Sequence, residues 1–167
     1  MTEKAPSREK LESRARNVLL FQLSKGAKSK AQLRAILVKR EIPEDIAEPI
    51  LNRFEEAGLI DDRQFANVVV NSRRAHKGLS RSAIKRELGT KGVAAEVIED
   101  ALSEVTSEDE LETAQELAIK KLRAMSHLDK AVQDRRLSGY LGRKGYSGGV
   151  VYAAIRYARE QTVKSEV

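Results

Sequence analysis

The chain has no cysteine and no tryptophan, and only 4% of its residues are aromatic. The absence of cysteine excludes disulfide bonds and thiolate metal sites, and it is compatible with a reducing compartment. With four tyrosines and three phenylalanines, the sequence offers few flat side chains on which unpaired bases can stack. We therefore expect any contact with DNA to be made mainly through its phosphates.

Long apolar segments are missing as well. No run approaches the roughly 20 consecutive apolar residues that a membrane-spanning helix needs. The first ten residues, MTEKAPSREK, are polar and lack the apolar centre of a secretory signal. We therefore expect a cytoplasmic protein with no membrane partner.

Motifs for catalysis and cofactor binding are also absent. His76 and His127 stand alone in the sequence, without the spacing of metal ligands. The phosphate loop GxxxxGK[ST] and the dinucleotide motif GxGxxG do not occur. The acids between Glu99 and Glu116 have the spacing of a solvated helix face. The sequence thus predicts no enzyme, with no catalytic residue, no metal and no cofactor.

Helical periodicity is present along almost the whole chain. Apolar residues recur at intervals of three and four from Leu11 onward, and no segment alternates as a strand does. Gly26 and Gly58 stand where helices are expected to end. Ser29 is placed to cap a second helix, and Pro43 suits the first turn of a third. The first ten residues are expected to fray.

The same helical pattern occurs three times. The segment that starts at Ser29 matches the one that starts at Ser80 with an offset of 51 residues, and a copy from Asp134 follows at an offset of 53. The matched apolar positions are Leu33, Ile84 and Leu137; Leu37, Leu88 and Leu141; and Ile42, Val93 and Tyr146. A fixed period with matched core positions indicates a tandem array of one supersecondary unit.

We therefore predict an all-α protein, an elongated tandem array of three three-helix repeats that resemble helix-turn-helix units. The repeats are predicted over residues 11–58, 59–106 and 107–162, with tails at 1–10 and 163–167.

Two helix starts carry recognisable capping residues. Asp61 and Gln64 have the spacing of an N-capping pair, and Ser107 and Glu110 have that of a capping box. Phe65 is expected in the core of the middle repeat. The last helix of that repeat is expected to pack through Val97, Ala101 and Val105.

Charge is distributed in blocks along the chain, whose formal net charge is +6. Residues 63–93 hold eight Lys or Arg and one acid, whereas residues 94–116 hold nine acids and no Lys or Arg. Basic residues return from 117 to 144. The blocks predict a basic face and an acidic face. A surface of both signs suits a protein partner that is itself bound to DNA.

The basic residues of the last two repeats are the candidate binding site. On the helix that begins at Ser80, Ile84 and Leu88 are expected to be buried. Arg81, Lys85 and Arg86 would then lie on the exposed arc. Arginines at 73 and 74 have two interpretations, favourable charge at a helix end or contact with phosphate and carboxylate. The candidates for DNA and partner contact are Arg73, Arg74, Lys77, Arg81, Lys85, Arg86, Arg135, Arg136, Arg143 and Lys144. The four tyrosines, Tyr140, Tyr146, Tyr152 and Tyr157, are interpreted mainly as packing residues.

The middle of the chain resembles the signature of the RecX family, the bacterial modulators of RecA recombinase. The matching elements are Gly58-Leu59-Ile60-Asp61-Asp62, Phe65-Ala66, Ser72-Arg73-Arg74, Lys77-Gly78, Ile84, Glu87-Leu88 and Lys91-Gly92-Val93. The chain departs from the family pattern twice. Leu59 stands where the family often has an aromatic residue, and Ser80 where a second glycine is common.

The resemblance implies a non-enzymatic regulator that binds the RecA filament on single-stranded DNA, and we expect a monomer. It also implies inhibition of the recombinase, ATPase and co-protease activities. Two other functions are compatible with the residues. An autonomous helix-turn-helix protein would bind duplex DNA without RecA, and a structural adaptor would use the acidic block and ignore DNA.

Overall fold

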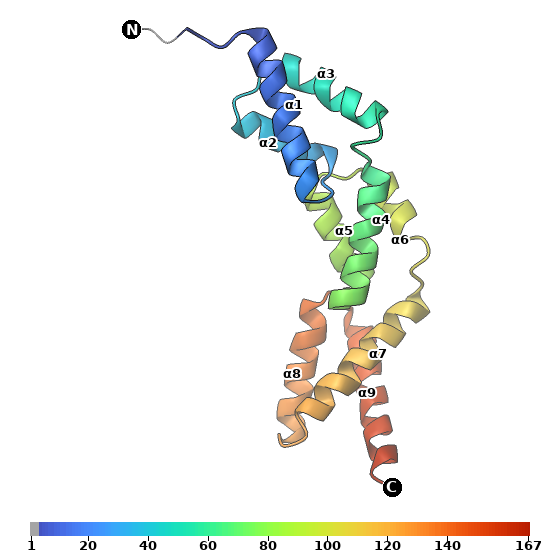
Figure 1. Cartoon of the computed structure of the whole chain (residues 1–167). Helices are drawn as coiled ribbons and strands as arrows, with labels where there is room; N and C mark the ends of the chain where they lie inside the picture. The colour runs from blue at the N-terminus through green and yellow to red at the C-terminus, as the bar shows by residue number, and fades with distance from the viewer. Residues whose placement is uncertain (1–3) are drawn as a thin grey trace. The chain divides into compact units, whose positions relative to one another are not determined.

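The computed structural model of the chain describes residues 4–167 and contains no strand over that range. Figure 1 shows helices joined by short connections. The elements are α1 (Arg8–Lys25), α2 (Lys30–Lys39), α3 (Glu44–Glu56), α4 (Asp62–Ser72), η1 (Arg73–Lys77), α5 (Arg81–Thr90), α6 (Ala95–Leu102), α7 (Ser107–Ala124), α8 (Lys130–Arg143) and α9 (Gly148–Ser165). The prediction of an all-α chain of three-helix repeats is confirmed.

The helices form two compact units. The first comprises the chain up to Val68 together with Leu88–Ile98, and the second comprises Val69–Glu87 together with Glu99–Val167. The middle repeat contributes to both units. The predicted repeat boundaries therefore describe the periodicity of the sequence, and as structural boundaries they stay predictions.

Each unit has a hydrophobic core built by the helices of one terminal repeat. In the first unit, α1, α2 and α3 enclose Leu19, Leu37 and Leu51, which are fully buried. In the second unit, α7, α8 and α9 enclose a corresponding cluster that includes Leu141 and Ala154. No helix among residues 4–167 is both long and apolar enough to cross a membrane.

The matched apolar positions of the three repeats are all buried. Leu33, Ile84 and Leu137 have no exposed surface, and neither do Leu37, Leu88 and Leu141. The third set, Ile42, Val93 and Tyr146, is 4–6% exposed. The repeat deduced from sequence thus corresponds to equivalent core positions in the fold.

A Lys-Gly pair makes the same kind of joint in both units. In the first unit, the hydroxyl of Ser29 donates a hydrogen bond of 2.5 Å to the carbonyl of Lys91. A Cβ added at Gly92 would collide with the side chain of Ala31. The backbone of Gly92 also has a φ of 78°. This glycine is therefore required by close packing and by its left-handed conformation.

The joint recurs in the second unit. The amide of Ser80 donates to the carbonyl of Lys144 over 3.0 Å, and Gly145, with a φ of 95°, lies against Ser80 and Ala83. The hydroxyl of Ser80 accepts a hydrogen bond of 3.1 Å from the amide of Ala83. Ser80, one of the two departures from the family pattern, thus caps α5 at this position.

The structure corrects the expected ends of the chain. Residues 1–3 lie outside the described residues, but α1 begins at Arg8, inside the segment expected to fray. The hydroxyl of Ser7 caps it by accepting a hydrogen bond of 3.3 Å from the amide of Lys10. At the other end α9 continues to Ser165, past the expected end of its repeat at residue 162. Helical bonding carries both helices beyond their apolar stripes.

The capping box of α7 lies one residue earlier than predicted. Thr106, not Ser107, is the N-cap, because its backbone is extended while Ser107 already belongs to the helix. The hydroxyl of Thr106 accepts from the amide of Asp109 at 3.1 Å, and the carboxylate of Asp109 accepts from the amide of Thr106 at 2.9 Å. The cap pair at α4 is confirmed, since Asp61 accepts from the amide of Gln64 at 3.1 Å.

The packing face of α6 also differs from the prediction. Val97, Ala101 and Val105 are only half-buried, and the buried residues are Ile98 and Leu102. Val105 lies beyond the end of α6 at Leu102, whereas Val97 and Ala101 lie on the helix next to the buried pair. Packing against neighbouring helices decides which of these residues face the core.

Candidate functional site

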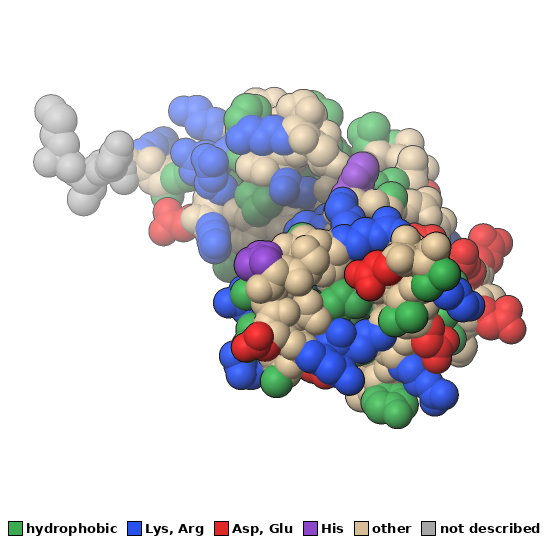
Figure 2. Space-filling view, turned by 90° about the horizontal axis from the view of Figure 1, so that it is seen from below, with side chains coloured by type: hydrophobic (Ala, Val, Ile, Leu, Met, Phe, Trp, Pro, Cys, Tyr) green, Lys and Arg blue, Asp and Glu red, His purple; other side chains and the backbone are tan. Residues whose placement is uncertain are grey.

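All ten cations of the candidate site belong to the second unit. Figure 2 shows one face of the molecule, on which Lys and Arg side chains gather in groups with Asp and Glu between them. The candidates that are exposed on the surface are Lys77, Lys85, Arg86, Arg135, Arg136 and Arg143. The remaining four are half-buried.

Arg73 is committed to a contact inside the second unit. Its Nε lies 2.8 Å and 2.9 Å from the two carboxylate oxygens of Glu87. Both side chains are mostly shielded, with 23% and 27% of their surfaces exposed. Shielding from water strengthens such an ion pair relative to one at the surface. This arginine therefore positions the start of η1 against α5.

Arg74 is likewise held by neighbours in its own unit. Its Nη2 donates to the hydroxyl of Thr113 at 3.1 Å and to the carbonyl of Asp109 at 3.4 Å. The guanidinium thus crosses from η1 to the first turns of α7. Its Nη1 is shielded from solvent and has no hydrogen-bond partner in residues 4–167.

Arg81 is not on the exposed arc where the sequence placed it. Its side chain is half-buried, and its Nε is shielded from solvent with no hydrogen-bond partner in residues 4–167. Lys85 and Arg86 are exposed as predicted. Lys85 approaches Glu99 at 3.6 Å, and a pair this exposed contributes little to stability.

The segment between α4 and α5 is a π-helical turn, η1, which no sequence pattern indicated. It ends at Gly78, whose φ is 60°. The hydroxyl of Tyr146 donates a bond of 2.6 Å to the carbonyl of Gly78, and the ammonium of Lys144 donates to the carbonyl of Lys77 over 2.5 Å. Residues of the third repeat therefore hold the end of this turn.

Replacing Tyr146 by phenylalanine should destabilise the protein by about 1–2 kcal/mol, because the buried carbonyl of Gly78 loses its donor. Burial raises the pKa of the Tyr146 phenol to about 12. A raised pKa means that the tyrosine's contribution is fully present below the unfolded pKa of about 10 and is lost as the pH rises toward the folded one.

Urea unfolding of both proteins at neutral pH and near pH 11 checks this. The difference in unfolding free energy between the wild type and Tyr146→Phe is expected to shrink at the higher pH. A difference that stays constant or grows would contradict the assigned hydrogen bond.

A basic pocket of about 490 Å³ lies between η1, α7 and α8. Of the ten predicted cations it contains Arg74, Lys77 and Lys144. It adds three basic residues that were not selected from the sequence, namely His76, Lys120 and Lys121. The two lysines belong to the basic block at 117–144, which was the available signal. The remaining candidates do not line this pocket.

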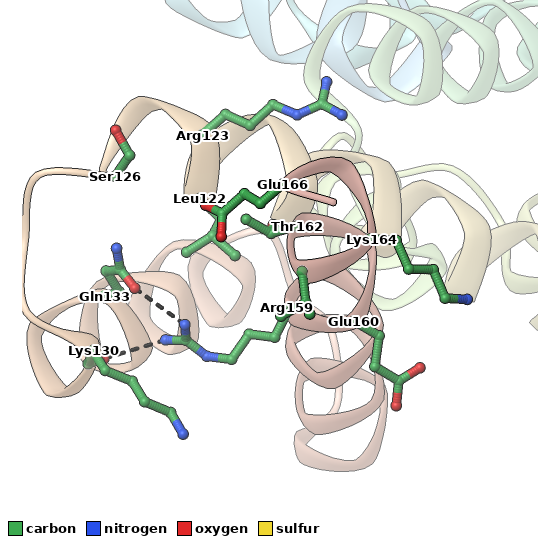
Figure 3. A pocket seen from close by; sticks show the side chains of 11 residues that line it. Leu122, Arg123, Ser126, Lys130, Gln133, Arg159, Glu160, Thr162, Lys164 and Glu166 are labelled. Atoms are coloured by element: carbon green, nitrogen blue, oxygen red, sulfur yellow. Dashed lines mark hydrogen bonds between the residues drawn. The ribbon is translucent and has the colours of Figure 1, made fainter.

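A second, more open pocket of about 880 Å³ lies among α7, α8 and α9. Arg159 crosses it, with Nη1 3.1 Å from the side-chain oxygen of Gln133 and Nη2 3.3 Å from the carbonyl of Lys130 (Figure 3). Asp134 neutralises the same guanidinium at 2.5 Å. In Figure 3 the side chains of Arg123 and Lys164 extend away from Arg159. The charges of this pocket therefore do not converge on one point.

The tyrosines are divided between core and surface. Tyr146 is buried, whereas Tyr152 is 69% exposed and Tyr157 is 38% exposed. The ring of Tyr140 is accompanied by two ammonium groups, Lys121 at 4.9 Å and Lys144 at 5.1 Å from its centroid. Among the described residues no group of three or more His, Asp or Glu is arranged to hold a metal ion.

Comparison with known proteins finds relatives along most of the chain. A family model for the second three-helix domain of RecX matches residues 61–102, and one for the third three-helix domain matches residues 108–155. The regulatory protein RecX of Streptomyces coelicolor is 47% identical over 156 residues, which cover 93% of this chain and 82% of that protein.

The regulatory protein RecX of Thermobifida fusca is 38% identical over 148 residues, covering 89% of this chain and 80% of that protein. Among solved structures, the crystal structure of RecX from Lactobacillus salivarius superimposes with a TM-score of 0.77. That likeness covers 90% of this chain and 98% of the other, at 24% identity, and concerns the fold.

Proposed function

Because this chain belongs to the RecX family of regulatory proteins, we propose that it binds the filament that RecA recombinase forms on single-stranded DNA and restrains that filament. The observation that carries the proposal is the 47% identity to a RecX regulatory protein across nearly the whole chain. The protein acts by binding, without chemistry of its own, as a monomer in the cytoplasm.

The charge of the second unit supports a partner that carries DNA. The exposed cations on η1, α5 and α8 offer donors to phosphates and to carboxylates of a protein surface. The acidic block that contains α6 and the start of α7 would be unfavourable on naked DNA but is compatible with a protein surface. In this proposal Arg73 and Arg74 position η1, and the exposed residues make the contacts.

RecA's ATP hydrolysis on single-stranded DNA, measured as the protein is titrated in, tests the proposal. We expect hydrolysis to fall. If the rate falls when far less than one copy of the protein has been added per RecA, action at filament ends is favoured. If the fall needs about one copy per RecA, coating of the filament is favoured. An unchanged rate at saturating protein would refute the proposed function.

Reversing the charge of Lys85 and Arg86 to glutamate should raise the amount of protein needed for half-inhibition by at least about tenfold, because like charges would then meet across the interface. The matched control reverses Arg14 and Arg16, which are exposed on α1 of the first unit, and so changes the net charge equally. Circular dichroism verifies that both variants keep their helices. If the two variants inhibited equally well, the exposed face of α5 would not be part of the interface.

The alternative of an autonomous helix-turn-helix protein is tested in the same samples. It requires sequence-selective binding to duplex DNA in the absence of RecA. The regulatory names of the relatives favour the RecA proposal, and a gel-shift experiment with duplex DNA alone distinguishes the two.

A further inference from the structure

The basic pocket between η1, α7 and α8 has an unbalanced charge. Glu116 is the one carboxylate in its lining. The same lining contains the basic residues Arg74, His76, Lys77, Lys120, Lys121 and Lys144. These cations come from three separate segments of the sequence, so their convergence is a product of the fold of the second unit.

The wall that carries Lys77 is fixed before any ligand arrives. Gly78 follows it in a left-handed conformation, and a Cβ there would lie 2.8 Å from the side chain of Leu117. The hydroxyl of Tyr146 donates to the carbonyl of Gly78, and the ammonium of Lys144 donates to that of Lys77. Folding therefore orders the backbone that carries Lys77, and ordering that backbone adds no cost to the binding of a ligand.

The cations of the pocket repel one another when no anion is bound. Burial lowers the pKa of the Lys144 ammonium, and the nearby charge of Lys77 lowers it further. The ammonium groups of Lys121 and Lys144 both lie over the ring of Tyr140. An anion that enters would relieve this repulsion, so its binding gains from each cation around it.

The donors in the pocket are suited to phosphate. Arg74, whose planar fork can match either a carboxylate or a phosphate, already spends Nη2 on Thr113 and Asp109. The exposed donors that remain, Lys77, Lys120 and Lys121, are ammonium groups. Each carries a compact charge with three donors, which suits a tetrahedral phosphate approached from several sides.

We propose that the pocket formed by η1, α7 and α8 is a phosphate-binding site in which Lys77, Lys120, Lys121 and Lys144 hold one phosphate group. The phosphate comes either from the backbone of single-stranded nucleic acid or from a small phosphorylated molecule. The first source deepens the proposed function and rests on it, since the filament supplies such a strand.

The test measures how tightly phosphate-bearing probes bind the whole protein in the absence of RecA. A negative result can therefore be distinguished from a failure of the RecA proposal. The variant Lys120→Gln/Lys121→Gln removes two charges from the pocket. Its matched control, Arg123→Gln/Lys130→Gln, removes two charges from the neighbouring pocket of Figure 3. The probes are an oligothymidine, the same oligothymidine with an uncharged methylphosphonate backbone, sodium pyrophosphate and polyglutamate.

We expect the oligothymidine to bind the wild type and the control variant alike and to bind the pocket variant about tenfold or more weakly. The plot of log affinity against log salt should lose about 0.7 in slope, because the pocket holds one phosphate and each phosphate contact to a single strand contributes about 0.7. The methylphosphonate strand should not bind. Amide signals of Gly78 and Thr113 should shift in nuclear magnetic resonance spectra on binding.

The remaining outcomes separate the sources or overturn the site. Pyrophosphate that binds as tightly as the strand and displaces it would support the site and assign it to a small phosphorylated ligand. Equal loss of affinity in the two variants would mean diffuse attraction and would overturn the pocket. Polyglutamate that binds as well as the oligothymidine would overturn its assignment to phosphate.

Discussion

Replacing Gly145 by alanine is expected to lower the free energy of unfolding by about 2–4 kcal/mol. Two effects add. The backbone φ of 95° is one that a residue with a Cβ adopts at a cost of about 1–2 kcal/mol. The new methyl group would also collide with the hydroxyl of Ser80 and lie 2.7 Å from the Cβ of Ala83. Backbone and α5 must then shift, because neither neighbour is the end of a flexible side chain.

Gly142 provides a matched control three residues earlier in the chain. It lies within α8, and a Cβ there would meet open space. Alanine at this position should therefore stabilise the protein by about 0.5–1 kcal/mol, since glycine is a poor helix former. Urea unfolding followed by far-ultraviolet circular dichroism measures both. If the two substitutions changed the free energy of unfolding in the same direction, the close packing assigned to Gly145 would be wrong.

The second large effect is expected in the core of the first unit. Leu37 has no exposed surface and belongs to the cluster formed by α1, α2 and α3. Truncation to alanine should destabilise the protein by about 3–5 kcal/mol, through lost burial and the cavity that remains.

The neighbouring residue Val38 is 66% exposed and lies on the same helix. Its replacement by alanine should change the unfolding free energy by no more than about 0.5 kcal/mol. Equilibrium denaturation of the two variants compares them directly. Similar losses would mean that the core assignment of α2 is wrong.

The joints explain why a short Lys-Gly signal recurs in this sequence. At Lys91-Gly92 and again at Lys144-Gly145, a lysine carbonyl is bound by a serine and the following glycine packs on a helix start. Each compact unit thus has one such joint, bonded through the hydroxyl of Ser29 in the first unit and through the amide of Ser80 in the second. Substitutions at either glycine should therefore lower the stability of the fold, and any effect on binding would follow from that loss.

The candidate site divides into residues that make the surface and residues that support it. Arg73 and Arg74 fit the family signature as well as any exposed cation does, but their guanidinium groups are bound within the second unit. A loss of function on replacing them would be ambiguous, because the position of η1 would change as well. Lys85 and Arg86 on α5, and Lys120 and Lys121 on α7, are exposed, and their replacement tests surface charge more directly.

The sequence by itself determined the helices, their threefold repetition and the matched core positions such as Leu37, Leu88 and Leu141. Those features follow from periodicity and residue type over a few turns, which are local properties of the chain. Gly92 and Gly145 stand at matching positions of two repeats, and both have a positive φ.

Only the tertiary structure decided which cations act together. The pairing of Arg73 with Glu87 and the meeting of Lys77, Lys121 and Lys144 depend on distances between segments far apart in the sequence. Likewise, the backbone conformation makes Thr106 the N-cap of α7 in place of the predicted Ser107. Composition fixes how much charge the chain carries, whereas packing fixes where the charges converge and which of them already have partners.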